Sequence, residues 1–283
     1  MKRYVFPIFL VIVCLKVFSQ DLSSPVYSLT TTNNLYGVTF IHLLDNYLSP
    51  LTYDGIGFRY DYSSRKYLSP NNLKLSRENQ FNLNIAVTEN PAKTSNISYL
   101  GMDYSWGLHY HFRPAKNVQL LAGSLWDIEF GLKANSRNQN NPMNIDLATN
   151  LNFSGMAIYD TRILKYPFRF QFTFSSPFLG LMFIPEQGES YYEIFELKNY
   201  SDILHFSSFH NKQGFAEELT IQVPLKHTTW KLAIRNDYLK YSANEMVFKR
   251  NDWAISLGYV FDIYKFAGRK NQPPANCISP NYK

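Results

Sequence analysis

The stretch Trp253–Phe266, WAISLGYVFDIYKF, decides the fold of this chain. Alternate residues separate into an apolar face, which runs from Trp253 to Ile263, and a face of small or polar residues that includes Ser256 and Asp262. Successive side chains of a β-strand point to opposite faces of the sheet, so this pattern predicts a strand with one apolar and one wetter side. A transmembrane β-strand needs about 9–11 residues. The stretch is long enough to be one.

The same alternation recurs along the chain in segments that are separated by turn residues. Aromatic residues make up 17% of the sequence, with 21 Tyr and 22 Phe, yet the apolar runs after the N-terminus are too short for a spanning helix of about 20 residues. This combination favours alternating strands over helices. We expect eleven strands, at residues 28–44, 54–62, 80–88, 96–112, 118–133, 145–159, 168–174, 203–210, 215–223, 230–241 and 253–266.

These segments predict an all-β fold, a transmembrane antiparallel up-and-down β-barrel. Bacterial single-chain barrels have an even number of strands. We therefore expect about 12, with residues 245–249 or part of 178–184 as the twelfth, and ten as the alternative. A soluble sandwich also alternates, but its strands are usually roughly 5–6 residues long, much shorter than residues 96–112. The polar segment 63–74 is expected to be a connection.

The N-terminus has the form of a secretory signal. Lys2 and Arg3 precede a short apolar run, and Ser19 precedes the expected mature start. We expect a cleaved signal peptide at residues 1–19, a barrel at 20–266 and a flexible tail at 267–283. The formal charge is +6, and three of these positive charges lie in the signal, which leaves +3 for the mature chain. That balance gives no reason to expect nucleic acid as a partner. Cys277 is then the single mature cysteine, which excludes an intrachain disulfide.

The faces opposite the apolar ones carry charges of both signs. In a narrow barrel such residues can pair across the interior, whereas an ion-selective pore more often has a ring of one sign. We expect a mostly filled, polar lumen. The predicted lumen network comprises Arg59, Asp61, Asp103, His109, His111, Asp127, Glu129, Arg169, Lys231, Arg235 and Asp262.

Three segments carry a family resemblance: Asp45–Pro50 followed by Gly55, Ser136–Pro142, and the stretch from Ser176–Gly180 to Tyr191–Phe195. On these segments the chain resembles a family of outer-membrane barrel proteins of Bacteroidota, classified as a domain of unknown function. The resemblance covers essentially the whole mature chain. It implies an outer-membrane location, and it implies no activity and no catalytic residues.

The sharpest candidate for chemistry is the pair His205 and Ser207. On a strand they share a face two residues apart, and a histidine can activate a serine hydroxyl by taking its proton. The pair resembles the His-x-Ser arrangement of outer-membrane phospholipases and lipid A deacylases, and Ser175–Phe178 resembles a phospholipase stretch. The Asn-Gly that usually follows the phospholipase pair is absent here. The alternative interpretation is that both residues form hydrogen bonds in the lumen.

Two other groups have weaker signals. His109 and His111 share a face with Asp103, which is compatible with zinc, but a third ligand would have to come from elsewhere. Asp127 and Glu129 form a same-face carboxylate pair that suits acid–base work. For both groups we favour polar packing in the lumen. The asparagine-rich loop 136–144 suits contact with glycans or calcium, but we favour an ordinary loop.

The sequence therefore predicts an outer-membrane barrel without enzymatic activity that is structural or docks a partner. We expect outer-membrane lipids as partners, with a second envelope protein as a further candidate, and no cofactor or metal. Two alternatives remain open: a lipid acyl hydrolase that uses His205 and Ser207, and a narrow channel for small solutes. Residues 175–197 break the strand pattern and are the place to look for a functional segment.

Overall fold

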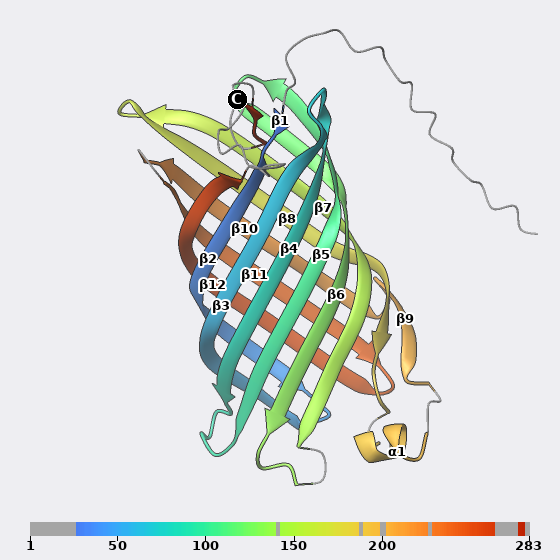
Figure 1. Ribbon diagram of the computed structural model, residues 1–283. Coiled ribbons are helices and arrows are strands. Elements are labelled where there is room, and N and C mark those ends of the chain that lie inside the picture. Colours follow the sequence, from blue (N-terminus) through green and yellow to red (C-terminus); the bar gives the residue numbers. More distant parts are fainter. Residues whose placement is uncertain are drawn as a thin grey trace, which may run out of the picture.

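The computed structural model describes residues 27–139, 142–186, 189–198, 202–225, 228–263 and 277–280. In these residues ten antiparallel strands form a closed barrel, because β8 also pairs with β10 (Figure 1). The predicted signal peptide lies outside the described residues. The barrel strands are β2 (Thr30–Asp45), β3 (Ser49–Ser69), β4 (Asn72–Glu89), β5 (Asn96–Ala115), β6 (Val118–Asn135), β7 (Met143–Ile163), β8 (Tyr166–Phe183), β10 (Lys212–Pro224), β11 (Thr229–Ala243) and β12 (Met246–Ile263).

The last barrel strand pairs with the first, as the sequence predicts. β12 runs antiparallel to β2, with a continuous register from Ile263 opposite Thr30 to Phe248 opposite Asp45. Along β12 the side chain of Trp253 is exposed and that of Ser256 is buried in the lumen. The alternation of this stretch therefore corresponds to the outer and inner faces of the barrel.

The closed sheet has ten strands, the lower of the two predicted numbers. Residues 178–183 continue β8, and residues 246–249 continue β12, so neither forms a further strand. β9 (Leu204–Ser208) pairs with the C-terminal part of β8, whereas β10 pairs with the first half of the same strand. The turn between β9 and β10 shifts the register, so both elements lie along one neighbour. Of the eleven segments expected from the sequence, β9 and β10 therefore share one position beside β8, which leaves ten positions in the barrel.

The strands extend further than the alternation alone suggests. The predicted connection at 63–74 is a hairpin, because β3 continues to Ser69 and β4 begins at Asn72. Ladder pairs such as Arg65 opposite Glu78 continue almost to the turn. Outside a lipid layer both faces of a strand can be polar, so the pattern fades there although the backbone pairing persists.

The two ends of the barrel differ. At the end that carries the described termini, two-residue turns join β3 to β4, β5 to β6 and β7 to β8 (Figure 1). There β1 (Tyr27–Ser28) pairs in parallel with β13 (Cys277–Ile278), in the described part of the predicted tail. The opposite end carries the longer loops and the short helix α1 (Tyr191–Phe195). We call these the terminal end and the loop end.

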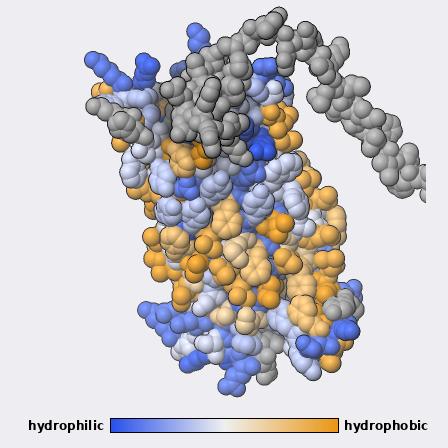
Figure 2. Space-filling view, viewed as in Figure 1, coloured by the Kyte–Doolittle hydropathy of each residue, from blue (hydrophilic) through white to orange (hydrophobic). Residues whose placement is uncertain are grey.

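An exposed apolar belt surrounds the middle of the barrel, with polar residues towards both ends (Figure 2). Large side chains of the belt, among them Phe58, Ile85 and Ile255, have about half of their surface exposed. Aromatic residues lie at its margin, where the tilted rings of Tyr36 and Tyr60 have centroids 5.1 Å apart. Among the described residues, no helix is long and apolar enough to cross a bilayer.

Candidate functional site

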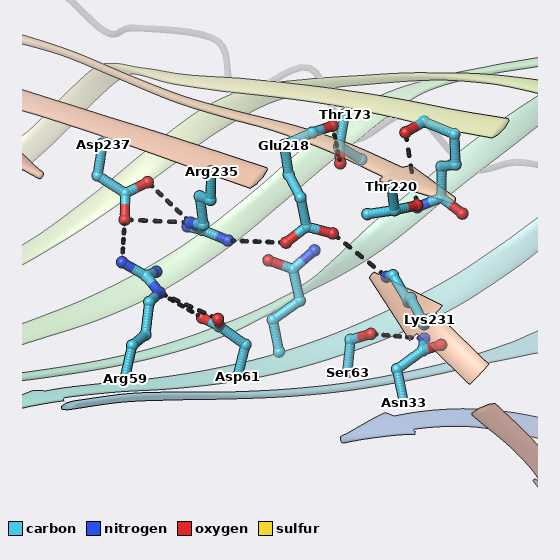
Figure 3. A network of polar contacts seen from close by, with 12 residues as sticks. Asn33, Arg59, Asp61, Ser63, Thr173, Glu218, Thr220, Lys231, Arg235 and Asp237 are labelled. Atoms are coloured by element: carbon cyan, nitrogen blue, oxygen red, sulfur yellow. Dashed lines mark hydrogen bonds and ion pairs between the residues drawn. The ribbon is translucent and has the colours of Figure 1, made fainter. Parts of the chain in front are cut away.

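A network of buried charges crosses the middle of the lumen (Figure 3). Arg59 on β3 donates from Nε to Asp61 at 2.8 Å and from Nη1 to Asp237 on β11 at 2.6 Å. Its side chain is almost fully buried. β12 and β2 lie between β11 and β3 in the sheet, so this arginine joins two parts of the barrel wall that are not neighbours.

The network continues from Asp237 along β11 and β10. Arg235 Nε donates to Asp237 at 2.9 Å, and its guanidinium lies 3.8 Å from Glu218. Lys231 Nζ lies 3.2 Å from Glu218. Cations and carboxylates thus alternate along the path from Asp61 to Lys231 (Figure 3). Because each buried charge has an opposite neighbour, the lumen tolerates them.

Other residues of the predicted network have more local partners. Asp262 accepts a hydrogen bond from Thr31 at 2.6 Å at the terminal end. Arg169 binds Asp160 on the neighbouring strand at 2.6 Å. Glu129 accepts from the buried Lys212 at 2.5 Å. These contacts fill the lumen along its length, which is what the mixed signs of charge predict.

The candidate carboxylate pair separates into two roles. Asp127 accepts hydrogen bonds from the side chains of Asn150 at 2.8 Å and Asn152 at 2.6 Å, whereas Glu129 is paired with Lys212. Asp103 and both carboxylates line a cavity of about 100 Å³, which has room for a few water molecules.

The two candidate histidines have separate partners. His109 Nε2 lies 2.9 Å from Ser154 Oγ, and His111 Nε2 lies 2.7 Å from Ser76 Oγ. Both rings are buried. Within the described ranges, no group of three His, Cys, Asp or Glu side chains is placed to hold a metal ion. The histidines therefore act as hydrogen-bonding groups of the lumen wall.

A second charged cluster closes the lumen at the loop end. Lys133 on β6 is completely buried, with its Nζ 2.5 Å from Asp45 and 2.8 Å from Asp146. The ammonium also lies 3.9 Å from the centre of the Phe248 ring. Tyr241 donates to Asp146 at 2.5 Å. The cation is therefore enclosed by two carboxylates and an aromatic face, and its side chain has no contact with solvent.

Apolar side chains surround this cluster and fill the same part of the barrel. They come from β2, β3, β4, β5, β8, β11 and β12 and from the adjoining loops, and none has more than a tenth of its surface exposed. We call them the mouth cluster: Ile41, Leu43, Tyr47, Leu48, Tyr53, Ala86, Ile97, Tyr99, Met182, Ile184, Tyr241, Met246 and Phe248. The loop half of the lumen is thus a hydrophobic core, which the sequence does not predict.

The segment with α1 covers the mouth cluster. Ser190 caps α1 by accepting from Glu193 N, and the Glu193 carboxylate accepts in return from Ser190 N at 2.8 Å. Hydrogen bonds from the Ser190 backbone and hydroxyl lower the pKa of Glu193. The Ile194 side chain is fully buried, and Tyr191 OH donates to Asn144 at 2.7 Å. Asn144 donates in turn to Asp45 at 2.8 Å, which links the helix to the Lys133 cluster.

Tyr47 offers a pH-dependent test of this cover. Its hydroxyl donates to the Glu189 carbonyl at 2.7 Å. Burial, together with the charges of Asp45, Glu189 and Glu193, raises its pKa from 10.0 to about 12. A group with a raised pKa contributes stability that is complete below its unfolded pKa and is lost as the pH rises through the folded value.

We therefore expect Tyr47 to lower the free energy of unfolding of the wild type between about pH 10 and pH 12. Denaturant unfolding in detergent micelles should show a smaller loss for Tyr47→Phe over that interval. Tyr166→Phe, which removes the hydroxyl of an exposed tyrosine, is the matched control and should follow the wild type. Parallel pH profiles for Tyr47→Phe and the wild type would contradict this assignment.

The structure places His205 and Ser207 on the same face of β9 without joining them. Ser207 is 1% exposed, and His205 Nε2 is a buried nitrogen without a hydrogen-bond partner in the described part of the chain. In this segment the histidine that contacts a serine is His210, whose Nδ1 lies 2.6 Å from Ser208 Oγ. Because that contact is exposed and no described carboxylate orients His210, it lacks the third member of a triad.

Several residues of these clusters are absent from the predicted network. Asp237 and Glu218 carried the right signal, since each lies at an inward position of a predicted strand. Asp252 continues the alternation of Trp253–Phe266 by one inward position and accepts from Asn84 at 3.1 Å. Lys133 is the last inward position of the predicted strand 118–133 and carried the same signal, whereas Asp45 lies just beyond the predicted strand 28–44.

Solved structures with a similar fold share little sequence with this chain. Ail of Yersinia pestis, in complex with the heparin analogue sucrose octasulfate, is 11% identical, with 82% of this chain and 99% of that chain covered and a TM-score of 0.32. The outer membrane protease OmpT from Escherichia coli is 7% identical, with 83% and 96% covered and a TM-score of 0.41. The transport unit of the autotransporter AIDA-I from Escherichia coli is 8% identical, with 86% and 94% covered and a TM-score of 0.42.

All three TM-scores lie below 0.5, so these similarities assign no function. No curated protein matches the sequence. A family model, by contrast, matches residues 6–270, which is nearly the whole chain. Its description is a protein of unknown function, DUF3316, and it agrees with the resemblance to a domain-of-unknown-function family. The chain therefore belongs to the DUF3316 family.

Proposed function

We propose that this protein is an integral outer-membrane barrel that conducts no solutes, has no enzymatic activity and presents its loop end to a partner. The closed sheet supports insertion, because a barrel leaves no unpaired strand edge in lipid. The exposed apolar belt supports it independently. Short turns are typical of the periplasmic side, so the terminal end faces the periplasm and α1 faces outward. We also propose that the protein comes from a member of the Bacteroidota and that its signal peptide is cleaved on export.

The observation that carries the closed state is the double seal at the loop end. The mouth cluster fills the lumen there, and Lys133 lies inside it without contact to solvent. A conducting pore keeps polar, hydrated groups along its path, whereas this path crosses a hydrophobic core. A narrow channel is therefore a poorer interpretation than a sealed barrel.

The cover over the mouth supports the docking role. Tyr192, Phe195 and Leu197 each have more than half of their surface exposed, although Ile194 between them is fully buried. Exposed apolar residues that gather on a fixed segment often mark an interaction surface. The rigid lumen below would hold this segment in place.

A photoreactive residue at Phe195 in living cells tests the docking role. We expect one discrete cross-linked envelope protein at Phe195. The control position is Leu164, which is 88% exposed in a turn at the terminal end and should not yield the same adduct. Identical adducts at both positions, or none at Phe195, would contradict docking at the loop end.

The hydrolase alternative has its own test. We expect wild-type protein and Ser207→Ala to release no acyl chains from phospholipid or lipid A in mixed micelles, because His205 and Ser207 share no hydrogen bond in the described chain. Release by the wild type that Ser207→Ala abolishes would overturn the proposal that the barrel is not an enzyme.

A further inference from the structure

A groove of about 220 Å³ lies where β2, β3, β4 and β12 approach the terminal end. Its polar lining comes mainly from outward positions of these strands, since the lumen charges occupy the alternate positions. The lining residues on which the inference depends are Thr30, Thr32, Ser64, Lys66, Arg77 and Asn79.

The groove lies at the depth where lipid headgroups are expected. On β3 the outward positions change from Tyr60 and Tyr62 in the belt margin to Ser64 and then Lys66. Tyr60 contacts Phe81 of β4 with ring centroids 6.4 Å apart. Aromatic side chains of this kind mark the boundary between acyl chains and headgroups. Ser64 and Lys66, the next two outward residues of β3 beyond these tyrosines, therefore face the headgroups.

Two cations stand directly opposite each other in this groove. Lys66 is the register partner of Arg77. Like charges in that position destabilise a sheet. In the described residues neither has an acidic partner, because Glu78, the nearest carboxylate on the strand, points inward and binds Arg65 at 3.0 Å. The groove therefore has an unbalanced positive charge that an anion would neutralise.

An unsatisfied hydroxyl lies beside these cations. Thr32 is 2% exposed, and its Oγ1 has no hydrogen-bond partner in the part of the chain that the structure describes. Its neighbour across the ladder, Ser64, accepts from Asn79 at 3.3 Å. A buried hydroxyl without a partner costs free energy of folding. Thr32 Oγ1 is therefore available to donate a hydrogen bond to a ligand.

We propose that this groove binds the phosphate of an anionic glycerophospholipid. The Lys66 ammonium and the Arg77 guanidinium would neutralise the phosphate, and Thr32 Oγ1 would donate to a phosphate or ester oxygen. The acyl chains would then extend over Tyr62, the lining residue that is one outward position nearer the belt than Ser64. The inference rests on the proposed insertion in a membrane and adds a lipid class and a site to it.

Native mass spectrometry of the full-length protein, with phosphatidylglycerol and phosphatidylcholine added to detergent micelles, tests the site. We expect the wild type to bind phosphatidylglycerol more tightly. Lys66→Gln/Arg77→Gln should weaken that binding by about fivefold for each cation removed. The matched control is Lys240→Gln/Lys249→Gln, which removes another pair of opposed cations, near the loop end, and should bind as the wild type does.

Thr32→Val gives a second test that leaves the charge unchanged. Valine matches threonine in shape, and the hydroxyl has no partner to lose, so the barrel should fold as before. Binding of phosphatidylglycerol should fall by about fivefold if the hydroxyl donates to the lipid. Unchanged binding by both Thr32→Val and the double variant would overturn the proposal.

Competition with inorganic phosphate distinguishes a site for the phosphate of a lipid from a site for free phosphate. Failure of millimolar phosphate to displace phosphatidylglycerol supports a lipid site, whereas full displacement overturns it in favour of free phosphate. Reconstitution into phosphatidylglycerol vesicles separates this inference from the proposed function. A wild type that inserts but shows no headgroup preference overturns the groove alone, whereas a wild type that does not insert overturns both.

Discussion

Replacement of Lys133 by methionine is expected to lower the free energy of unfolding by about 3–5 kcal/mol. The substitution keeps the length of the side chain and removes its charge. The buried Asp45 and the mostly buried Asp146 then remain without the ammonium that lies 2.5 and 2.8 Å from them. Removal of one partner from a buried ion pair is costly because the remaining charge is not compensated. Denaturant unfolding in detergent micelles, followed by tryptophan fluorescence, gives the measurement.

Two further variants make this result specific. Lys74→Met removes an exposed lysine near the terminal end and should change the free energy of unfolding by less than about 0.5 kcal/mol. The triple variant Lys133→Met/Asp45→Asn/Asp146→Asn neutralises the whole cluster and should recover most of the lost stability. A Lys133→Met protein as stable as the wild type would show that the cluster does not hold the mouth closed.

Replacement of Arg59 by methionine is the second change with a large expected effect. The guanidinium joins Asp61 to Asp237 across the lumen, with distances of 2.8 and 2.6 Å. We expect a loss of about 3–5 kcal/mol, measured in the same way. Arg59→Lys should recover only part of it, because an ammonium lacks the fork that binds two carboxylates at once.

The control for Arg59 is Arg162→Met, which removes an exposed arginine beside the β7–β8 turn and should leave the unfolding midpoint unchanged. The double variant Arg59→Met/Asp61→Asn should be more stable than Arg59→Met alone, since one of the two carboxylates is neutralised. If Arg59→Lys equals the wild type, the network depends on charge alone, and the bidentate geometry has no separate role.

Much of the fold is present in the sequence because one rule applies along every strand. In Trp253–Ile263 the apolar residues face out and the small or polar ones face in. Whether a residue has an odd or even position in the strand (its parity) therefore predicts both the lipid face and the closing strand. Parity also placed Arg59 and Asp61 inside. It did not identify Asp237, the second partner of Arg59, because the partner across a barrel depends on the register of strands that are far apart in the sequence.

The mouth cluster shows where the rule ends. Ile41 and Leu43 point inward, and Leu44 points outward, so both faces of this part of β2 are apolar and alternation gives no signal. The same holds for Met246 and Phe248, which precede the clear part of β12. An apolar residue was interpreted as lipid-facing, yet at the loop end it belongs to a core that forms only after the barrel closes.

The His205–Ser207 pair shows a different limit. Alternation correctly places two residues that are two apart on one face, but a shared face sets neither a hydrogen bond nor access to substrate. In the structure Ser207 is buried. β9 itself was expected as a full barrel strand, although it shares one neighbour with β10 because a register shift lies between them. Such irregularities depend on tertiary pairing, which a local pattern does not contain.

Single-channel recording in planar bilayers tests most directly whether the barrel is sealed. Insertion is verified on the same preparation by the different electrophoretic mobility of heated and unheated protein. The wild type is predicted to give no current steps above the leak of the bare bilayer, because the mouth cluster and the buried Lys133 close the lumen. Stable, reproducible conductance steps from folded, inserted wild-type protein would contradict the sealed barrel.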